Sequence, residues 1–444
     1  MKRYLLIVMM ALLAGCAVTK PPDTRKQVVP PYHSVLPEIA PIETPAMLSM
    51  RDALALALEH NPNLSALALE VEAREGTELQ AGLLPNPQLS LDVENFGRSR
   101  KRLDQLNGPE YTLAIGQLVE LGGKRAARVR VASYDRRLSL WDYESARADL
   151  LARTARDFVA VLTAQEQAAL ARDGIRVSEE THAAVLAKIE AGKVSPIEET
   201  RAMVLVARAR LAADRAKGEL ASARARLAAN WGGAHAGFEQ AIGGLGEPDP
   251  LPELALLHQE LGSHPDIARW EDEIHRREAE LKLARAKRIP DPTVVGGFRF
   301  LDETDETGFL AGVSFPLAVS DRNQGGVQTA DRRLSQAKAR QRAAIIDRRA
   351  ALTVAFEGAR SARHQVLVIK AEILPGADRA LESTREAYRQ GKLGLTDVLD
   401  TERAWFETRA ELLTALRNYH GHRAALETLV GRPLTEIATT EEKP

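Results

Sequence analysis

Residues 124–190 decide the fold, and they read KRAARVRVASYDRRLSLWDYESARADLLARTARDFVAVLTAQEQAALARDGIRVSEETHAAVLAKIE. The stretch contains no proline and a single glycine, Gly174, and it is rich in residues that favour helices. At ~1.5 Å per residue, one continuous helix of this span is on the order of 100 Å long. Because no globular core is that wide, we expect the helix to run along a tube or a coiled coil.

Apolar residues recur with the spacing of a coiled coil. In the second half of the chain, steps of three and four residues connect Leu352, Ala355, Ala359, Ala362, Val366, Ile369 and Ile373. The same rhythm connects Leu151, Ala155, Phe158 and Leu162. Small alanines at such positions let helices approach closely. Pro375 interrupts the second long helix, and its counterpart in the first lies near Gly174, so both helices are expected to bend there.

The chain matches itself with an offset of about 200 residues, which indicates a two-fold duplication. The matching motifs are Asn61-Pro62 with His264-Pro265, Leu84-Pro85-Asn86-Pro87 with Ile289-Pro290-Asp291-Pro292, Gly122-Gly123-Lys124-Arg125 with Ser320-Asp321-Arg322-Asn323, Ala191-Gly192-Lys193-Val194 with Gln390-Gly391-Lys392-Leu393, and Trp231-Gly232 with Val430-Gly431. Each copy is expected to contain a helix, two strands, a very long helix, a tight turn and another helix.

Four segments alternate apolar and polar residues, the period of a strand with one apolar face. They are residues 88–96 and 111–119 in the first copy and 293–301 and 308–317 in the second. Their length suits tilted strands that cross a bilayer. The pattern also fits an ordinary soluble sheet. If the strands do cross a membrane, four of them cannot close a barrel alone, so several copies of the chain have to combine.

The N-terminus resembles a lipoprotein signal. Lys2 and Arg3 precede a short apolar run that ends in Leu13-Ala14-Gly15-Cys16, and Cys16 is the only cysteine of the chain. The box predicts a covalent lipid on Cys16, and Ala17 after it favours the outer membrane. A plain signal peptide is the alternative. No later segment is apolar for the length of a transmembrane helix.

Seven prolines between residues 21 and 45 predict an extended tether after the lipid anchor. The complete expected organisation is a signal peptide at 1–15, a Pro-rich tether at 16–46, a first structural repeat at 47–232, a connector at 233–250, a second structural repeat at 251–433 and a C-terminal tail at 434–444.

Charge and composition exclude several classes of function. With 60 Lys plus Arg and 61 Asp plus Glu, the net charge is −1, so no basic excess for nucleic acid is present. A single cysteine rules out an intrachain disulfide and a cysteine-based metal site. No HExxH, Walker A loop or nucleophile elbow occurs, and the ten histidines are scattered. We therefore expect no enzyme activity, no resident metal and no cofactor other than the lipid on Cys16.

Two motifs carry a resemblance to a known family. One is Leu84-Pro85-Asn86-Pro87 leading into Glu94-Asn95-Phe96-Gly97, and the other is Gln117-Leu118-Val119-Glu120-Leu121-Gly122-Gly123-Lys124-Arg125. With the lipoprotein start, tandem halves and long helices, the chain resembles TolC-type outer-membrane efflux proteins, in particular their CzcC-like heavy-metal branch. The resemblance implies a mainly α protomer with a small β part, whose four strands contribute to a 12-stranded trimeric β-barrel continued by a long α-helical barrel.

The resemblance also implies a function and a set of partners. The expected function is an outer-membrane exit duct that passively conducts heavy-metal cations such as cobalt, zinc, cadmium or copper/silver. Expected partners are two further copies of the chain, a periplasmic adaptor (membrane fusion) protein, an inner-membrane resistance-nodulation-division transporter and outer-membrane lipid, with the helical barrel in the periplasm. A duct for drugs or secreted proteins, and a periplasmic coiled-coil scaffold without a barrel, are the alternatives.

The candidate functional residues lie in the two helix-to-helix turns. Glycine is expected to end each first helix in the left-handed region, and Ser195 and Thr396 are expected to cap the following helices. The resemblance implies that the turns contact the adaptor through Gly192, Lys193, Val194, Ser195, Gly391, Lys392, Leu393, Gly394 and Thr396. A turn made only for structure is the alternative.

Two aspartates follow the second turn. Asp397 and Asp400 are three residues apart and so share a helix face. The resemblance implies that they constrict the entrance of the duct as rings of carboxylates. The equivalent positions of the first turn hold Glu198 and Arg201, so only one turn of each chain supplies the rings. Stabilisation of the helix N-terminus is the simpler role of such acids.

Overall fold

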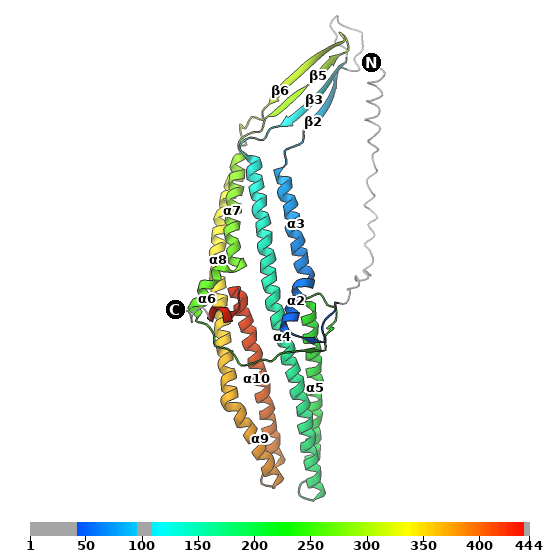
Figure 1. The fold of residues 1–444 in the computed structure, drawn as a ribbon, viewed down its shortest axis with the longest axis vertical. Coiled ribbons are helices and arrows are strands. Elements are labelled where there is room, and N and C mark those ends of the chain that lie inside the picture. The colour runs from blue at the N-terminus through cyan, green and yellow to red at the C-terminus, as the bar shows by residue number, and fades with distance from the viewer. Residues whose placement is uncertain (1–41, 96–108, 439–444) are drawn as a thin grey trace. The chain divides into compact units, whose positions relative to one another are not determined.

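The computed structural model describes residues 42–95 and 109–438, which belong to the unit Pro41–Pro444 (Figure 1). Cys16, the signal segment and most of the predicted tether lie outside the described residues, as do Phe96 and Gly97 of the first family motif. Among the described residues, no helix is both long and apolar enough to span a membrane.

The two halves of the chain share a helix, two strands, a long helix, a turn and another helix, and differ in their short elements. The first contains β1 (Met47–Leu48), α2 (Met50–His60), α3 (Pro62–Gly82), β2 (Gln88–Glu94), β3 (Glu110–Leu118), α4 (Lys124–Glu190), α5 (Ile197–Ala229) and β4 (Gln240–Ala241). The second contains α6 (Leu254–Glu260), the 3-10 helix η2 (Leu261–Ser263), α7 (Pro265–Ala286), β5 (Thr293–Leu301), β6 (Glu306–Ser314), α8 (Gln324–Val368), the π-helix η3 (Ile369–Ile373), α9 (Leu374–Arg389), α10 (Leu395–Val430) and α11 (Leu434–Ala438). The predicted long helix and the four strands are confirmed, the strands with ends shifted by up to three residues.

Equivalent caps start α3 and α7. The Asn61 side chain accepts a hydrogen bond from the Leu64 amide at 2.9 Å, and His264 Nδ1 accepts one from the Asp266 amide at 3.1 Å. A proline follows each cap, where its missing N–H has no intrahelical partner to lose. The matched pair of dipeptides therefore marks the same structural position in the two copies.

The starts of α4 and α8 correct one sequence match. Gly123 before α4 and Asn323 before α8 both adopt the left-handed conformation, with φ of +71° and +54°. These two residues are the equivalents, whereas the motif match pairs Gly123 with Asp321. Asparagine tolerates a positive φ better than most residues, so a glycine and an asparagine serve the same turn.

The long helices pack side by side around α4. It lies against α3, α5, α7 and α10, while α8 packs on α7 and α10. The largest core joins α4, α5 and α10 with the β1–β4 pair, and its largest fully buried side chains are Trp231, Phe158, Leu48 and Leu227. A second core joins α6, α8, α10 and α11 around Leu257, Leu352 and Leu426.

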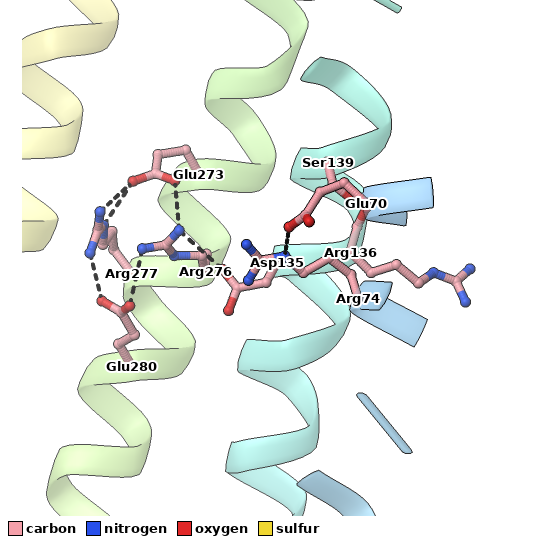
Figure 2. A network of polar contacts seen from close by, with 9 residues as sticks. All are labelled: Glu70, Arg74, Asp135, Arg136, Ser139, Glu273, Arg276, Arg277 and Glu280. Atoms are coloured by element: carbon pink, nitrogen blue, oxygen red, sulfur yellow. Dashed lines mark hydrogen bonds and ion pairs between the residues drawn. The ribbon is translucent and has the colours of Figure 1, made fainter. Parts of the chain in front are cut away.

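Ion pairs also join the two copies where α4 meets α7. Figure 2 shows Asp135 of α4 directed at Arg276 of α7, whose Nη1 lies 3.0 Å from the Asp135 Oδ1. On α7, Arg276 and Arg277 lie between Glu273 and Glu280. The guanidinium nitrogens are 2.8 to 3.6 Å from the carboxylate oxygens. Burial raises the pKa of Asp135 above its ordinary value, although Arg276 opposes the shift.

The coiled-coil seam of α8 is confirmed up to Ile369. Leu352, Ala355, Ala359, Ala362, Val366 and Ile369 are buried, but Ile373, the last member of the predicted series, is 43% exposed. The π-helix η3 runs from Ile369 to Ile373, and its wider turn holds an extra residue, which rotates the following side chains off the seam. The predicted interruption before Pro375 is therefore a π-turn.

The corresponding position in the first copy is not interrupted. Helix α4 is continuous through Gly174, so it has no counterpart of the π-helix η3. The ring of Phe406 on α10 lies against this glycine, 3.5 Å from where a Cβ would stand. Gly174 thus provides room for an aromatic ring from the neighbouring helix.

The four-stranded sheet is antiparallel, with the order β2-β3-β5-β6. The pairing of β3 with β5 joins the two copies. The strands adjoin the C-terminal ends of α3 and α7 and the N-terminal ends of α4 and α8, so the sheet lies at that end of the helices (Figure 1). The turns after α4 and α9 lie at the opposite end.

The second family motif meets Ile289-Pro290-Asp291-Pro292, the repeat counterpart of the first motif, where the sheet joins the helices. Lys124 Nζ lies 2.6 Å from Asp291 Oδ1 and also donates to the Ile289 carbonyl. The Leu121 amide donates to the same Asp291 oxygen at 2.8 Å. Lys124 is only 8% exposed. Burial acts to raise the pKa of Asp291, but these hydrogen bonds and the Lys124 charge leave it below its ordinary value.

Candidate functional site

Both helix-to-helix turns have the predicted left-handed glycine. The φ angles are +65° at Gly192 and +76° at Gly391, and a Cβ on either would meet no atom within 4 Å. In the first turn the Lys193 amide bonds to the Lys188 carbonyl at 2.9 Å, and in the second the Lys392 amide bonds to the Ala387 carbonyl at 2.9 Å. These bonds define the Schellman motif that ends a helix.

The start of the helix after each turn differs from the prediction. Thr396 was expected to cap α10, but α10 begins at Leu395 and Gly394 is its N-cap. The Asp397 carboxylate instead accepts a hydrogen bond from the Gly394 amide at 2.9 Å. In the first turn the Ser195 hydroxyl accepts a long bond of 3.4 Å from the Ile197 amide, as a capping residue does, but Pro196 precedes the assigned start of α5.

The residues predicted to contact the adaptor lie on the surface of the two turns. Gly192, Lys193, Ser195, Gly391, Lys392, Leu393, Gly394 and Thr396 are exposed, and Val194 is half-buried. Asp397 and Asp400 are exposed as well, and Asp400 lies 3.9 Å from Arg403 on the same helix. A role in docking or in constriction stays a prediction for all of them.

A small core holds the two turns together. It consists of Val185, Ala202, Tyr388, Leu395 and Val398, from α4, α5, α9 and α10. The Lys188 ammonium lies 3.5 Å from the centre of the Tyr388 ring and donates to the Tyr388 carbonyl. Burial lowers the pKa of Lys188 and raises the pKa of Tyr388. The sequence analysis missed Lys188, because a pairing across about 200 residues leaves no local pattern.

Glu402 is a second residue that the sequence analysis missed. It is 2% exposed, on the first turns of α10, and its Oε1 accepts from Thr181 of α4 at 2.8 Å and from Arg385 of α9 at 3.0 Å. Burial raises its pKa, and the hydrogen bonds from Thr181 and Arg385 act in the other direction. A signal was present, since Leu395, Val398 and Glu402 follow coiled-coil spacing and place a charge on a seam.

The sheet presents two chemically different faces. Leu91, Leu113, Phe298 and Phe309 are paired across all four strands and share the apolar face, where Phe309 is 87% exposed. On the other face Arg299 binds the Glu110 carboxylate at 3.1 Å and the Thr112 hydroxyl at 3.1 Å. An exposed apolar face opposite a polar one is typical of strands that lie between lipid and water.

The described residues contain no close group of three His, Cys, Asp or Glu side chains that could hold a metal ion. The structure thus places the two turns, Lys188 and Glu402 near one end of the helices. The two-faced sheet lies at the opposite end (Figure 1).

Residues 53–233 and 256–432 match the outer membrane efflux protein family, one range in each copy of the duplication. This chain belongs to that family. Its mainly helical protomer with a small sheet is thus the fold of outer-membrane efflux components, and its place of action is the outer membrane.

Relatives and solved structures agree with this membership. The chain is 33% identical to the cobalt-zinc-cadmium resistance protein CzcC of Cupriavidus metallidurans, over 92% of this chain and 94% of that protein. It is 24% identical to the probable outer membrane lipoprotein SilC of Salmonella typhimurium, over 90% and 92%. The fold is similar to crystal structures of CusC, with a TM-score of 0.74 at 19% identity over 87% and 94% of the chains. It is also similar to the Campylobacter jejuni outer membrane channel CmeC, with a TM-score of 0.72 at 17% identity over 89% of each.

Proposed function

We propose that this efflux family member is the exit duct of a tripartite pump, and that it conducts heavy-metal cations passively across the outer membrane. Three copies assemble, with four strands from each in one β-barrel. A periplasmic adaptor binds the helical turns and joins the duct to an inner-membrane resistance-nodulation-division transporter. The observation that carries the proposal is the sheet, whose exposed apolar face suits lipid and whose polar face suits a water-filled lumen.

The edges of the sheet explain why several copies are needed. β2 and β6 are the outer strands of the order β2-β3-β5-β6, so each has one edge that no other strand of the described sheet covers. Unpaired edges are not tolerated in lipid, because backbone groups there have no water to bond. Pairing β6 of one copy with β2 of the next satisfies both edges.

The cargo is proposed from the relatives. CzcC bears cobalt, zinc and cadmium resistance in its name and matches almost the whole chain. A duct of this kind needs only weak binding along its path, because a tight site would retain the ion. A duct for drugs or secreted proteins is the second candidate.

Growth in the presence of metals tests the cargo. The host lacks this duct and keeps its adaptor and inner-membrane transporter. Restoring the duct is expected to restore tolerance to cobalt, zinc or cadmium and to lower the metal content of the cells. Restored tolerance to drugs with no change in metal content would show that the cargo is different.

We also propose that the mature chain carries its lipid on Cys16. The similarity to SilC, named as a probable outer membrane lipoprotein, supports this. Acyl chains contribute ~0.8 kcal/mol per buried CH₂, so two or more anchor a protein stably. Cys16→Ser is expected to abolish incorporation of labelled palmitate, and incorporation at the wild-type level would refute the assignment.

A further inference from the structure

We propose that Glu402 is a proton-sensitive latch between the two helical hairpins. Its protonated form holds α9 and α10 against α4 close to the turns, and its ionised form favours their separation. The inference rests on the proposed function, in which these turns form the entrance of the duct.

The contacts of Glu402 connect three helices at one point. Oε1 accepts from Thr181 Oγ1 of α4 at 2.8 Å, and from Arg385 of α9 through Nη2 at 3.0 Å and Nε at 3.3 Å. Oε2 is buried and has no hydrogen-bond partner within the described part of the chain. A carboxylate with one satisfied and one unsatisfied oxygen is costly to keep ionised, and a proton on Oε2 removes the charge.

The charges around Glu402 do not offset its burial. Arg385 is the cation in contact, and Glu180 of α4 acts against ionisation. Arg201 and Arg208 of α5, with Arg403 and Glu407 of α10, line a hollow of about 550 Å³ that also adjoins Glu402. A buried ion pair often costs more in desolvation than its attraction returns, and here the net effect raises the pKa of Glu402.

The structure also provides for movement of the α9–α10 side. The π-helix η3 separates α8 from α9, and Pro375 lies in the first turn of α9, whereas α4 continues unbroken past Thr181 to its turn. The hollow next to Glu402 gives water access to the carboxylate once the helices part. Nearer the turns, the four helices meet in the small cluster around Val185 and Tyr388.

Proton linkage fixes the direction of the effect. Glu402 binds its proton more tightly in the latched arrangement than in the separated one, where water surrounds the carboxyl group. Acid therefore favours the latched arrangement and rising pH favours separation. With one proton per chain, the ratio of separated to latched hairpins rises by at most about tenfold per pH unit.

Distance measurement between spin labels tests the latch. Labels are placed at two exposed positions beside the contact, Ala183→Cys on α4 and Ser383→Cys on α9, in the full-length protein in lipid. Variants with one new cysteine account for any labelling of Cys16. From about pH 4 to about pH 8, the wild-type distance distribution is expected to shift towards longer distances as the pH rises.

Three variants sharpen the test. Glu402→Gln, which imitates the protonated form, is expected to keep the short distance at every pH. Thr181→Val removes a hydrogen bond that joins α4 to the latch, so the hairpins are expected to separate at lower pH than in the wild type. Glu407→Gln, on the same hollow but not in contact with Thr181 or Arg385, is expected to behave like the wild type.

The outcomes separate this inference from the proposed function. A distance that does not change with pH, a pH response that survives in Glu402→Gln, or a transition that Thr181→Val leaves at the wild-type pH or moves to higher pH would overturn the latch. Channel conductance of the same preparations reports on the duct itself. If the channels conduct but the distance between the spin labels does not depend on pH, the proposed duct stands and the latch is wrong.

Discussion

His264 performs with an imidazole the capping task that Asn61 performs with an amide. It is 1% exposed, its Nδ1 accepts from the Asp266 amide, and the Arg348 guanidinium lies against the ring. Burial, and then the charge of Arg348, lower the pKa of His264. The neutral ring is therefore part of the fold, because a protonated Nδ1 cannot accept the capping bond.

This histidine makes stability depend on pH. A His pKa that is lower in the folded state gives stability that is present above the usual value near 6.5 and is lost as the pH falls below it. The loss is at most about 1.4 kcal/mol per pH unit. His264→Asn is expected to keep the cap and flatten this part of the profile, as measured by thermal unfolding across pH.

An exposed histidine gives the control. His235→Asn is expected to leave the pH profile as in the wild type, since His235 is on the surface. An unchanged profile in His264→Asn would show that other groups cause the acid sensitivity.

Gly391 adopts the left-handed conformation, and a Cβ there would meet no atom within 4 Å, so a substitution acts mainly through the backbone. Gly391→Val is expected to cost about 1–3 kcal/mol of local strain and to displace the turn, whereas Gly391→Asn fits the same conformation. Trimers are expected on a gel in both variants, with cross-linking to the adaptor reduced only in the valine variant. Equal cross-linking of the valine and asparagine variants would show that this turn does not dock the adaptor.

At the residue scale, helix ends that depend on local backbone conformation were predictable from the sequence. Contacts between residues far apart in the sequence were not. Gly192 and Gly391 follow from the local rule that a glycine ends a helix. Thr396 was predicted as a cap because its hydroxyl suits that role, but Gly394 takes the extended cap conformation and Asp397 supplies the acceptor. The partners of Glu402 come from two other helices, which no local pattern identifies.

At the scale of elements, the corner between sheet and helices depends on Lys124 and Asp291. The side chains of this ion pair are 10% and 19% exposed, and the pair connects the first copy to the second. Removing one member of such a buried pair leaves an unpaired charge and costs about 3–5 kcal/mol. Lys124→Met is expected to lower the thermal unfolding temperature markedly.

A surface pair provides the comparison. Arg147 and Glu144 are about half exposed and lie on one helix, so Arg147→Met is expected to cost between about 0 and 1 kcal/mol. Equal unfolding temperatures for the two variants would show that Lys124 does not hold the corner.

The elements themselves were largely predictable, because their periods are strong and long. Proline-free sequence gave the bounds of α4, and alternation gave the four strands. The π-turn was not predicted, because an extra residue in a helix changes the packing register without changing composition. Its effect appears only where Ile373 leaves the seam.

At the scale of the whole molecule, the duplication explains how one chain supplies two hairpins and four strands. The pairing of β3 with β5 makes one sheet from two copies, and the contact of α4 with α7 and α10 does the same for the helices. The number of chains and the path of the cargo are part of the proposed assembly of three copies. Sequence periodicity alone predicts that an oligomer is needed and does not give its size.

Single-channel conductance in a planar lipid bilayer tests the central claim, a cation-conducting duct, most directly. The purified protein is expected to give discrete openings with a preference for cations. Asp397→Asn with Asp400→Asn keeps an acceptor for the Gly394 amide and removes the charges, so it is expected to open more often and to lose cation preference severalfold. Glu411→Gln, an exposed change further along α10, is expected to match the wild type. Openings unchanged by the double substitution would place the aspartates away from the path, and a protein that never conducts would contradict the account.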